Sequence, residues 1–528
     1  MSPATAPPAG SAWPAWTRSA GWVLGALAVW LLCTAWARPL LLPDEGRYGE
    51  VARQMWLGDG LVPMLNGVPF FHKPPLSYWV NVAGLSVFGA VPFSVRLAPA
   101  LGAWLMGAAL WLTLRHRFDS RVAGISLLVL ATTPFFFIGG QYANHDMLVA
   151  GTITAAVLAF VHGLQPPPVG SAQRQPGGLR WLLLGWAFCG LALLSKGLIG
   201  VVLPALVIGP WLLVQGRWRD VLRLLHPLGL LVFVAVALPW LWAMQQRYAD
   251  FFDYFIVEQH FRRFAGRNFN NVQPGWFYLW VLPFLTLPWS PALWAAAGRV
   301  RRALQPPLSV GAADHRRWVG LLLWWVLVVV GFFSLPASKL VGYIMPALAP
   351  FCALLALAFT EADAYSRARL WLWRLSVGAI LFCLGLIVAL AIAAPKTGRD
   401  VGQALRGLVT PADVVVLVEQ SFNDVVFEAR LTQVPQVATD WTHPDVLGRD
   451  SWRKELADTV RFDAPRVQAV MLPVGQLATL VCRGHRVWLV EGNNPDPRSA
   501  TVPGVQVVLK GRNATLWRAE PQPCPPAG

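Results

Sequence analysis

The chain has 528 residues, of which 55% are hydrophobic and only 13% are charged, and its mean hydropathy is +0.49. These values exclude an ordinary soluble globular protein. Repeated apolar stretches, long enough to cross about 30 Å of hydrocarbon, predict a polytopic α-helical membrane protein. The net charge of +16 does not indicate nucleic acid as a partner, because the basic residues cluster in short gaps between apolar runs.

About eleven apolar runs meet the criterion of about twenty residues for a membrane span. They lie at about 21–41, 95–114, 122–138, 147–164, 180–195, 197–214, 222–243, 276–297, 318–335, 341–359 and 371–394. No small-residue cleavage site follows the first run, so we expect a retained first helix. If Arg18 lies inside, the other arginine-rich loops all fall on the same side. The positive-inside rule then places the N-terminus in the cytoplasm.

The first outer loop, 42–94, contains two amphipathic stretches, "DEGRYGEVARQMWLG" and "KPPLSYWVNVAGLSVFG". Each is too short or too polar to span a membrane, and each has an apolar face at helical spacing. We therefore expect a transmembrane domain over residues 1–395, whose first outer loop carries helices lying in the membrane interface.

The tail, residues 396–528, contains the β-rich runs "ADVVVLV", "VQAVMLPV", "HRVWLV" and "VQVVLKGRNATLWRAE", with a helical stretch "SWRKELADTV" between two of them. This pattern predicts a small soluble α/β domain outside the membrane. No glycine fingerprint, nucleophile elbow or P-loop occurs in it. Cys482 and Cys524 lie in this tail, where a disulfide is an open alternative if the tail faces an oxidising compartment.

Ionisable residues of both signs gather near helix ends on the predicted outer side. They are Asp44, Glu45, Arg47, Arg53, His72, Lys73, Asp146, Lys196, Glu258, His260, Arg262, Arg263, Arg267 and Lys339. An ionisable residue near membrane depth is costly and usually faces a cavity or a partner. Six loops that bring both signs to one face indicate an aqueous cavity at the outer leaflet.

Each of these residues also has an ordinary structural explanation. Asp44 follows a proline and precedes a helix, so N-capping is about as good an explanation as a catalytic role. Asp146 is equally suited to cap the helix that follows it. The lysines are of a length to reach lipid headgroups, and the histidines are typical of a membrane interface. Only their joint presence on one side favours a site.

The stretch "LLLPDEGRYGEVARQMWLGDGLVPMLNGVPFFHKPPLSYW" resembles the first periplasmic loop of bacterial GT-C-type polyprenyl-phosphate-sugar glycosyltransferases. The likeness is to the 4-amino-4-deoxy-L-arabinose lipid A transferases, which are related to protein O-mannosyltransferases. The matching pattern is P-D-E-x-R-Y, then G-D, then F-x-K-P. Further similar segments are "NHDMLVAG", "LSKGLIGVVLP", "EQHFRRFAG" and "SKLVGYIMPALAP", so the resemblance covers about residues 20–360. This family has about thirteen spans, two more than the apolar runs give.

The resemblance implies that Asp44 is the catalytic carboxylate, with Lys73 and Asp146 beside it around the donor phosphate. The further substrate-binding residues expected are Glu45, Arg47, Tyr48, Lys196, Arg262, Arg263 and Lys339. No cofactor is required for the chemistry. In this family a Glu, a His and a Tyr hold a structural zinc. Here the corresponding residues are His72, His260 and Tyr343. The chain therefore departs from the family pattern at the first ligand, where His72 replaces the glutamate.

The resemblance therefore implies a transferase in the bacterial inner membrane, with its active site and tail in the periplasm. It would move a sugar from undecaprenyl phosphate to lipid A or a related envelope glycan. Two alternatives stay open: transfer of another sugar to a protein or glycan acceptor, and a lipid or solute transporter with a charged outer cavity. A transporter predicts charges deep within spans and repeated halves, and the sequence shows neither.

Overall fold

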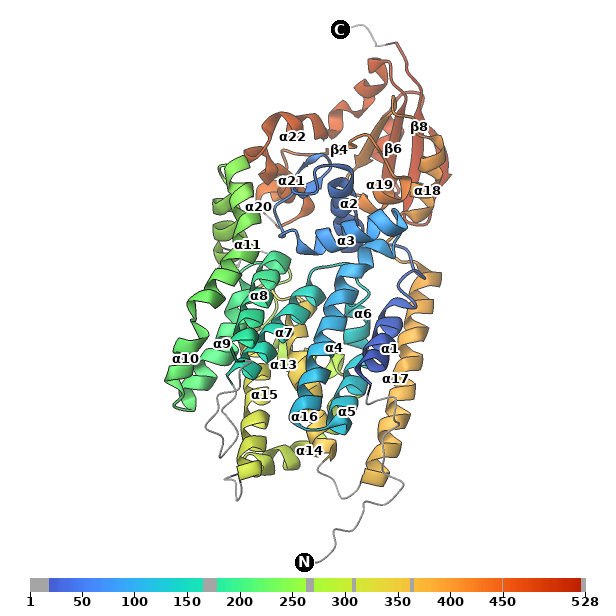
Figure 1. Ribbon diagram of the computed structural model, residues 1–528. Helices are drawn as coiled ribbons and strands as arrows, with labels where there is room; N and C mark the ends of the chain where they lie inside the picture. The colour runs from blue at the N-terminus through green and yellow to red at the C-terminus, as the bar shows by residue number, and fades with distance from the viewer. Residues whose placement is uncertain are drawn as a thin grey trace, which may run out of the picture.

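A helical bundle forms most of the protein, and the computed structural model describes residues 19–164, 178–262, 270–305, 310–360, 365–448 and 450–523. Figure 1 shows the bundle at one end, the C-terminal sheet at the other, and α2 and α3 between them. The bundle contains α1 (Ala20–Leu32), α4 (Leu97–Arg117), α5 (Ser120–Ala131), α6 (Pro134–Gly139), α7 (Asp146–Gly163), α8 (Gly178–Lys196), α9 (Ile199–Val214), α10 (Trp218–Leu224), α11 (Pro227–Arg247), α13 (Phe277–Leu285), α14 (Ser290–Ala303), α15 (Val310–Ser334), α16 (Leu348–Thr360) and α17 (Tyr365–Ala393).

The described residues contain seven helical segments long and apolar enough to cross a membrane, and these match seven of the predicted runs. The runs at 21–41, 122–138 and 197–214 contain the shorter apolar helices α1, α5 and α9. The run at 276–297 forms two short helices, α13 and α14. The predicted polytopic α-helical fold is confirmed, although several predicted spans are broken. Pro134, for example, opens a new helix within the run at 122–138.

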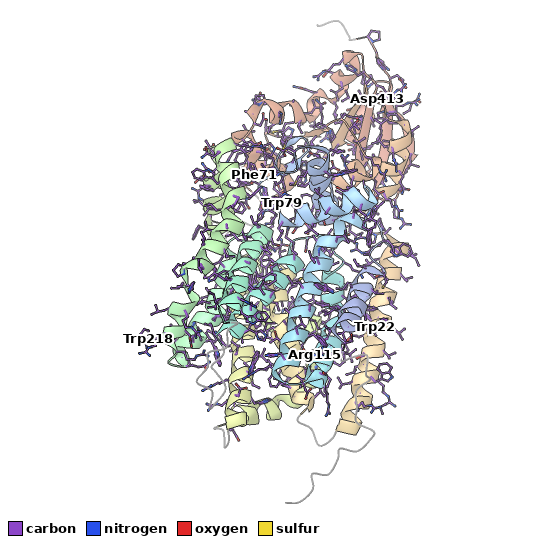
Figure 2. All side chains as sticks on the ribbon, viewed as in Figure 1. Trp22, Phe71, Trp79, Arg115, Trp218 and Asp413 are labelled. Atoms are coloured by element: carbon purple, nitrogen blue, oxygen red, sulfur yellow. The ribbon has the colours of Figure 1, made fainter. Side chains whose placement is uncertain are left out.

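The side chains agree with a bundle surrounded by lipid. In Figure 2, Trp22 and Trp218 lie at the outside of the bundle, and they are 72% and 56% exposed. Arg115 lies toward the end of the bundle remote from Asp413 of the C-terminal part. This separation fits the predicted division between a basic side and the side that carries the tail.

The segment between α1 and α4 forms a small layer on top of the bundle. It contains α2 (Asp44–Leu57), the strands β1 (Met64–Leu65) and β2 (Val68–Pro69), α3 (Leu76–Phe88) and the short helix η2 (Ser94–Arg96). The two strands pair as an antiparallel hairpin whose turn is Asn66-Gly67, with both residues at positive φ, as such a turn requires. Two more irregular helices, η3 (Asp253–Arg262) and η4 (Val341–Ala347), follow later in the chain.

The C-terminal part contains a six-stranded mixed sheet in the order β5-β4-β3-β6-β8-β7. Strands β3 to β6 pair in parallel, while β8 pairs antiparallel with both β6 and β7. Its elements are α18 (Arg399–Leu408), β3 (Val414–Val418), α19 (Asn423–Ala429), β4 (Gln436–Thr439), α20 (Asp445–Gly448), α21 (Trp452–Asp458), η5 (Thr459–Arg461), α22 (Ala464–Val470), β5 (Met471–Pro473), η6 (Val474–Arg483), β6 (Val487–Gly492), η7 (Arg498–Thr501), β7 (Gln506–Lys510) and β8 (Ala514–Ala519).

Most of the predicted tail elements are present, with one error. The run "VQAVMLPV" was predicted as a strand, but its first half belongs to α22 and only Met471–Pro473 forms β5. The side chain of Asp463 caps this helix and Pro465 lies in its first turn, and these two signals outweigh the β-branched residues. Cys482 has no disulfide among the described residues, and Cys524 lies outside them.

Helix α2 packs closely against α19 of the C-terminal part. A Cβ atom on Gly46 would lie only 2.7 Å from the backbone nitrogen of Asp424, so this crossing requires glycine. Asp424 itself is fully buried; it accepts hydrogen bonds from the Gly398 N–H and the Thr397 hydroxyl, while its other oxygen has no partner among the described residues. Burial outweighs these hydrogen bonds and raises the pKa of Asp424 to about 6.

We expect this contact to make the protein more stable at pH 5.5 than at pH 7.5. Because the folded pKa of Asp424 lies above its unfolded value, its contribution to stability is lost as the pH rises through about 6. Asp424→Asn should raise the free energy of unfolding at pH 7.5 by about 1–3 kcal/mol and remove this part of the pH dependence. Denaturant unfolding at both pH values measures it, with the exposed Asp496→Asn as the matched control. An unchanged pH dependence in Asp424→Asn would refute the assignment.

Candidate active site

Asp44 is the first residue of α2, and its carboxylate reaches the surface of the site. Its side chain is 32% exposed, against 10% for that of Asp146. The N-cap residue is Pro43, without a capping side-chain bond, so capping is not the role of this carboxylate. One oxygen accepts a hydrogen bond from Arg47 at 2.8 Å, and the other lies 3.5 Å from the hydroxyl of Tyr142. Burial, reinforced by the charge of Asp44, raises the pKa of Tyr142, so the phenol stays protonated as a donor.

Glu45, the next residue, is the centre of a buried ion-pair network. Its carboxylate pairs with the guanidinium groups of Arg38 and Arg96, and it accepts hydrogen bonds from the N–H groups of Leu41 and Ala143. Burial alone would raise the pKa of Glu45, but the charges and hydrogen bonds of Arg96 and Arg38 lower it to about 2. Because both oxygens of the Glu45 carboxylate already have partners, a structural role is favoured over the predicted contact with substrate. It fixes α2 against the loop that carries Tyr142.

Arg47 connects helix α2 with the C-terminal part of the protein. Its guanidinium donates to Asp44 at 2.8 Å and to Glu455 of α21 at 2.6 Å. The same Glu455 carboxylate lies 3.8 Å from Nδ1 of His72. Sequence reasoning missed Glu455, because nothing in "SWRKELADTV" distinguishes it from a solvent-exposed helix residue.

Asp146 and Lys196 form an ion pair at adjacent helix ends. Asp146 begins α7 and Lys196 ends α8, so each charge also has a favourable position relative to its helix dipole. Asn144 donates to the carboxylate of Asp146 at 3.0 Å, and the Lys196 ammonium lies 4.7 Å from the centroid of the Tyr343 ring. The structure thus brings together three residues that lie far apart in the sequence.

His145 is a buried residue of this region that sequence reasoning also missed, although it precedes Asp146 in the sequence. Its ring packs edge-on against Tyr48 and Tyr78, with centroid distances of 4.6 and 5.1 Å. Burial, followed by the charges of Lys73, Lys196 and Arg47, lowers the pKa of His145, so the imidazole is neutral at pH 7.

Three further predicted substrate-binding residues are Lys339, Arg262 and Arg263. Lys339 is buried, and its ammonium donates to the carbonyl groups of Gln273 and Pro336, which favours an anchoring role. Arg262 is exposed at the end of η3. Arg263 lies outside the described residues.

Each of the three predicted zinc ligands has another close neighbour in the structure. His72 Nε2 lies 2.6 Å from the hydroxyl of Tyr254, His260 Nδ1 lies 2.5 Å from the Phe255 carbonyl oxygen, and the ring of Tyr343 faces the Lys196 ammonium, which would repel a dication. His260 Nε2 is close to Gly197, where φ is +90° and a Cβ would collide with the ring. In the described part of the chain no group of three or more His, Cys, Asp or Glu side chains is placed to hold a metal. The zinc site therefore stays a prediction.

The sequence is similar to those of known glycosyltransferases. A family model described as dolichyl-phosphate-mannose-protein mannosyltransferase matches residues 72–242. An undecaprenyl phosphate-alpha-4-amino-4-deoxy-L-arabinose arabinosyl transferase of Sodalis glossinidius is 36% identical over 388 residues, which cover 71% of this chain and 65% of the relative. Its counterpart in Pseudomonas paraeruginosa is 34% identical over 365 residues, or 67% and 62%. The chain thus spans slightly less than two thirds of these relatives.

The structural comparison extends over nearly the whole chain. The crystal structure of ArnT from Cupriavidus metallidurans bound to undecaprenyl phosphate superposes with a TM-score of 0.78 and 22% identity, covering 96% of this chain and 100% of ArnT. The chain has the GT-C fold of ArnT. The resemblance inferred from the first outer loop is confirmed by the sequence relatives.

Proposed function

We propose that this chain is an integral glycosyltransferase of the bacterial inner membrane. It moves a sugar from a polyprenyl-phosphate donor to lipid A or a related envelope glycan at the periplasmic face. The names of the relatives support an undecaprenyl-phosphate donor, and the similar ArnT structure binds undecaprenyl phosphate. The arginine-rich loops support the orientation, since they are predicted to face the cytoplasm.

The position of Asp44 carries the proposal. Of the acids predicted for the site, Glu45 is fully buried between two arginines and Asp146 is paired with Lys196, whereas the carboxylate of Asp44 remains 32% exposed. Arg47 and Tyr142 orient it from two sides. This makes Asp44 the carboxylate that reaches an incoming acceptor.

The cations around His145 serve the leaving group. When the bond between the sugar and the lipid phosphate breaks, negative charge develops on the phosphate, and fixed positive charges stabilise it most effectively. We assign this role to Lys73 and Arg47, and the guanidinium of Arg47 offers a planar fork for phosphate oxygens. Asp146 holds Lys196 beside them and thus acts as a positioning residue. The donor arrives from the membrane, so no nucleotide site is needed.

The role of Asp44 follows from the acceptor. An acceptor hydroxyl must lose its proton, and Asp44 then serves as general base, a contribution of about 10²–10⁴-fold in rate. An acceptor phosphate is already ionised, and Asp44 then orients groups and balances the charge of Arg47. Both cases break the same bond between the sugar and the lipid phosphate.

The family match favours one second candidate, transfer of a different sugar to a protein or another glycan. Mass spectrometry of lipid A, envelope glycans and envelope proteins distinguishes the two. We expect a sugar on lipid A that is present with the gene, lost without it and restored by the wild-type gene but not by Asp44→Asn. A sugar lost from a protein instead supports the second candidate, and identical envelopes would refute both.

A further inference from the structure

Glu455 of α21 shares the guanidinium of Arg47 with the proposed catalytic carboxylate. Nη1 of Arg47 donates to Glu455 at 2.6 Å and Nη2 donates to Asp44 at 2.8 Å. The guanidinium carbon lies 5.2 Å from the centroid of the Tyr48 ring. Because the proposed function assigns Arg47 to the lipid phosphate, three anionic groups compete for this one cation. Glu455 itself has no part in the proposed mechanism.

The charges of this cluster oppose the binding of a phosphate. Two carboxylates, those of Asp44 and Glu455, pair with the single guanidinium of Arg47, so the three side chains together are net negative. Opposite charges attract a further anion only to the extent that they are not already compensated. Arg47 therefore attracts a phosphate most strongly when one of the two carboxylates gives it up.

Glu455 is the carboxylate that is free to exchange. Asp44 precedes Arg47 by three residues on α2, so the helix keeps these two side chains together. Glu455 reaches Arg47 from the C-terminal part, and both residues line a pocket of about 520 Å³, part of it open to solvent. The other oxygen of Glu455 lies 3.8 Å from Nδ1 of His72. The carboxylate thus has both space and a second polar neighbour when Arg47 turns to a phosphate.

Sugar transfer increases the charge that Arg47 must hold. The step forms the bond between sugar and acceptor and breaks the bond between sugar and donor phosphate, whose electron pair stays with the phosphate. A hydroxyl acceptor gives its proton to Asp44. The donor is a phosphodiester with one negative charge, whereas the released lipid phosphate is a monoester with about −1.5 to −2 charges at pH 7. Cations that stabilise the leaving group therefore also hold the product more tightly than the donor.

We propose that Glu455 is a counter-ion that takes Arg47 back from the lipid phosphate and thereby speeds release of the product. It acts through Arg47, so it is a positioning residue and not a catalytic one. The inference rests on the proposed function, because it requires a polyprenyl-phosphate donor. It gives the C-terminal part a role in every turnover.

The test measures the binding of undecaprenyl phosphate to the full-length protein in nanodiscs, for the wild type and Glu455→Gln. Glutamine removes the charge but retains the shape and an oxygen that accepts from Arg47, so the fold should be unchanged. We expect about 10-fold tighter binding by the variant, through slower dissociation. A residue that merely held Arg47 in place for the phosphate would give the opposite sign. Weaker or unchanged binding, or tightening through faster association alone, would overturn the proposal.

Product inhibition gives a second readout that a general loss of structure would not produce. Added undecaprenyl phosphate should inhibit steady-state transfer by Glu455→Gln at about 10-fold lower concentration than it inhibits the wild type. In an Arg47→Gln background, Glu455→Gln should have no further effect on the affinity, because the shared cation is gone. An equal gain in that background would contradict an action through Arg47.

The matched control is Glu258→Gln. Glu258 of η3 has the same exposed fraction as Glu455, 16%, and it also pairs with the C-terminal part, at 3.2 Å from Arg461. This variant should bind undecaprenyl phosphate as the wild type does; equal tightening would show that any loosened contact between the two parts suffices, and would overturn the role of Glu455. A wild-type protein that binds the lipid phosphate but transfers no sugar would refute the proposed function instead, since the binding comparison requires no transfer.

Discussion

Asp44→Asn should reduce sugar transfer by about 10²–10⁴-fold if the acceptor is a hydroxyl, because asparagine cannot take up the proton. The substitution retains the shape of the side chain, and Glu455 still pairs with Arg47, so the fold and the binding of the lipid donor should be unchanged. The measurement is the initial rate of transfer by purified protein at saturating donor. A phosphate acceptor should give a smaller loss, since no proton has to be removed.

The control for this prediction is Asp59→Asn, in the same outer loop. Asp59 pairs with Arg247 at the surface, where both side chains are about half exposed (49% and 47%), so its removal should leave the rate nearly unchanged. Full transfer by Asp44→Asn would contradict the role proposed for this residue, whatever the acceptor.

Glu45→Gln should have the largest effect on stability. The substitution leaves the guanidinium groups of Arg38 and Arg96 buried without their counter-charge, and breaking a buried ion pair in this way costs about 3–5 kcal/mol. The folded pKa of Glu45 is about 2, below its ordinary value, so its contribution is present above about pH 4.5 and is lost as the pH falls through 2.

Denaturant unfolding in detergent micelles at pH 7 measures the effect of Glu45→Gln. The control Glu520→Gln removes a 51% exposed carboxylate that pairs with Arg486 and Arg518, and it should change the free energy of unfolding by less than about 0.5 kcal/mol. Equal effects of the two substitutions would show that the buried network does not anchor α2.

The sequence predicted those parts of the site that depend on local pattern. Asp44 and Lys73 stand in one contiguous stretch, and the polarity of that stretch sets it apart from the apolar runs on either side. The spans were predictable for the same reason, since hydropathy is a local quantity. The polarity of this stretch and the hydropathy of the spans can both be read from the sequence without knowing which segments are in contact in the fold.

The remaining features depend on contacts between distant segments. Glu45 was predicted as a substrate ligand because the sequence does not reveal its partners, Arg38 and Arg96, which lie within two predicted apolar runs, 21–41 and 95–114. Glu455 lies in a tail without a functional motif, and only its ion pair with Arg47 of α2 connects it with the site. The neighbours of His72 depend on such contacts too, since its Nε2 lies 2.6 Å from the hydroxyl of Tyr254, which the sequence did not indicate.

The most direct test of the central claim is the fate of a doubly labelled donor, undecaprenyl-phosphate-linked sugar, given to the purified protein in nanodiscs with lipid A. We predict that labelled sugar appears on the acceptor in equal amount to the undecaprenyl phosphate released, and that Asp44→Asn lowers both amounts together. A donor that remains intact, or that crosses the bilayer of a reconstituted vesicle without cleavage, would contradict a transferase and favour a transporter.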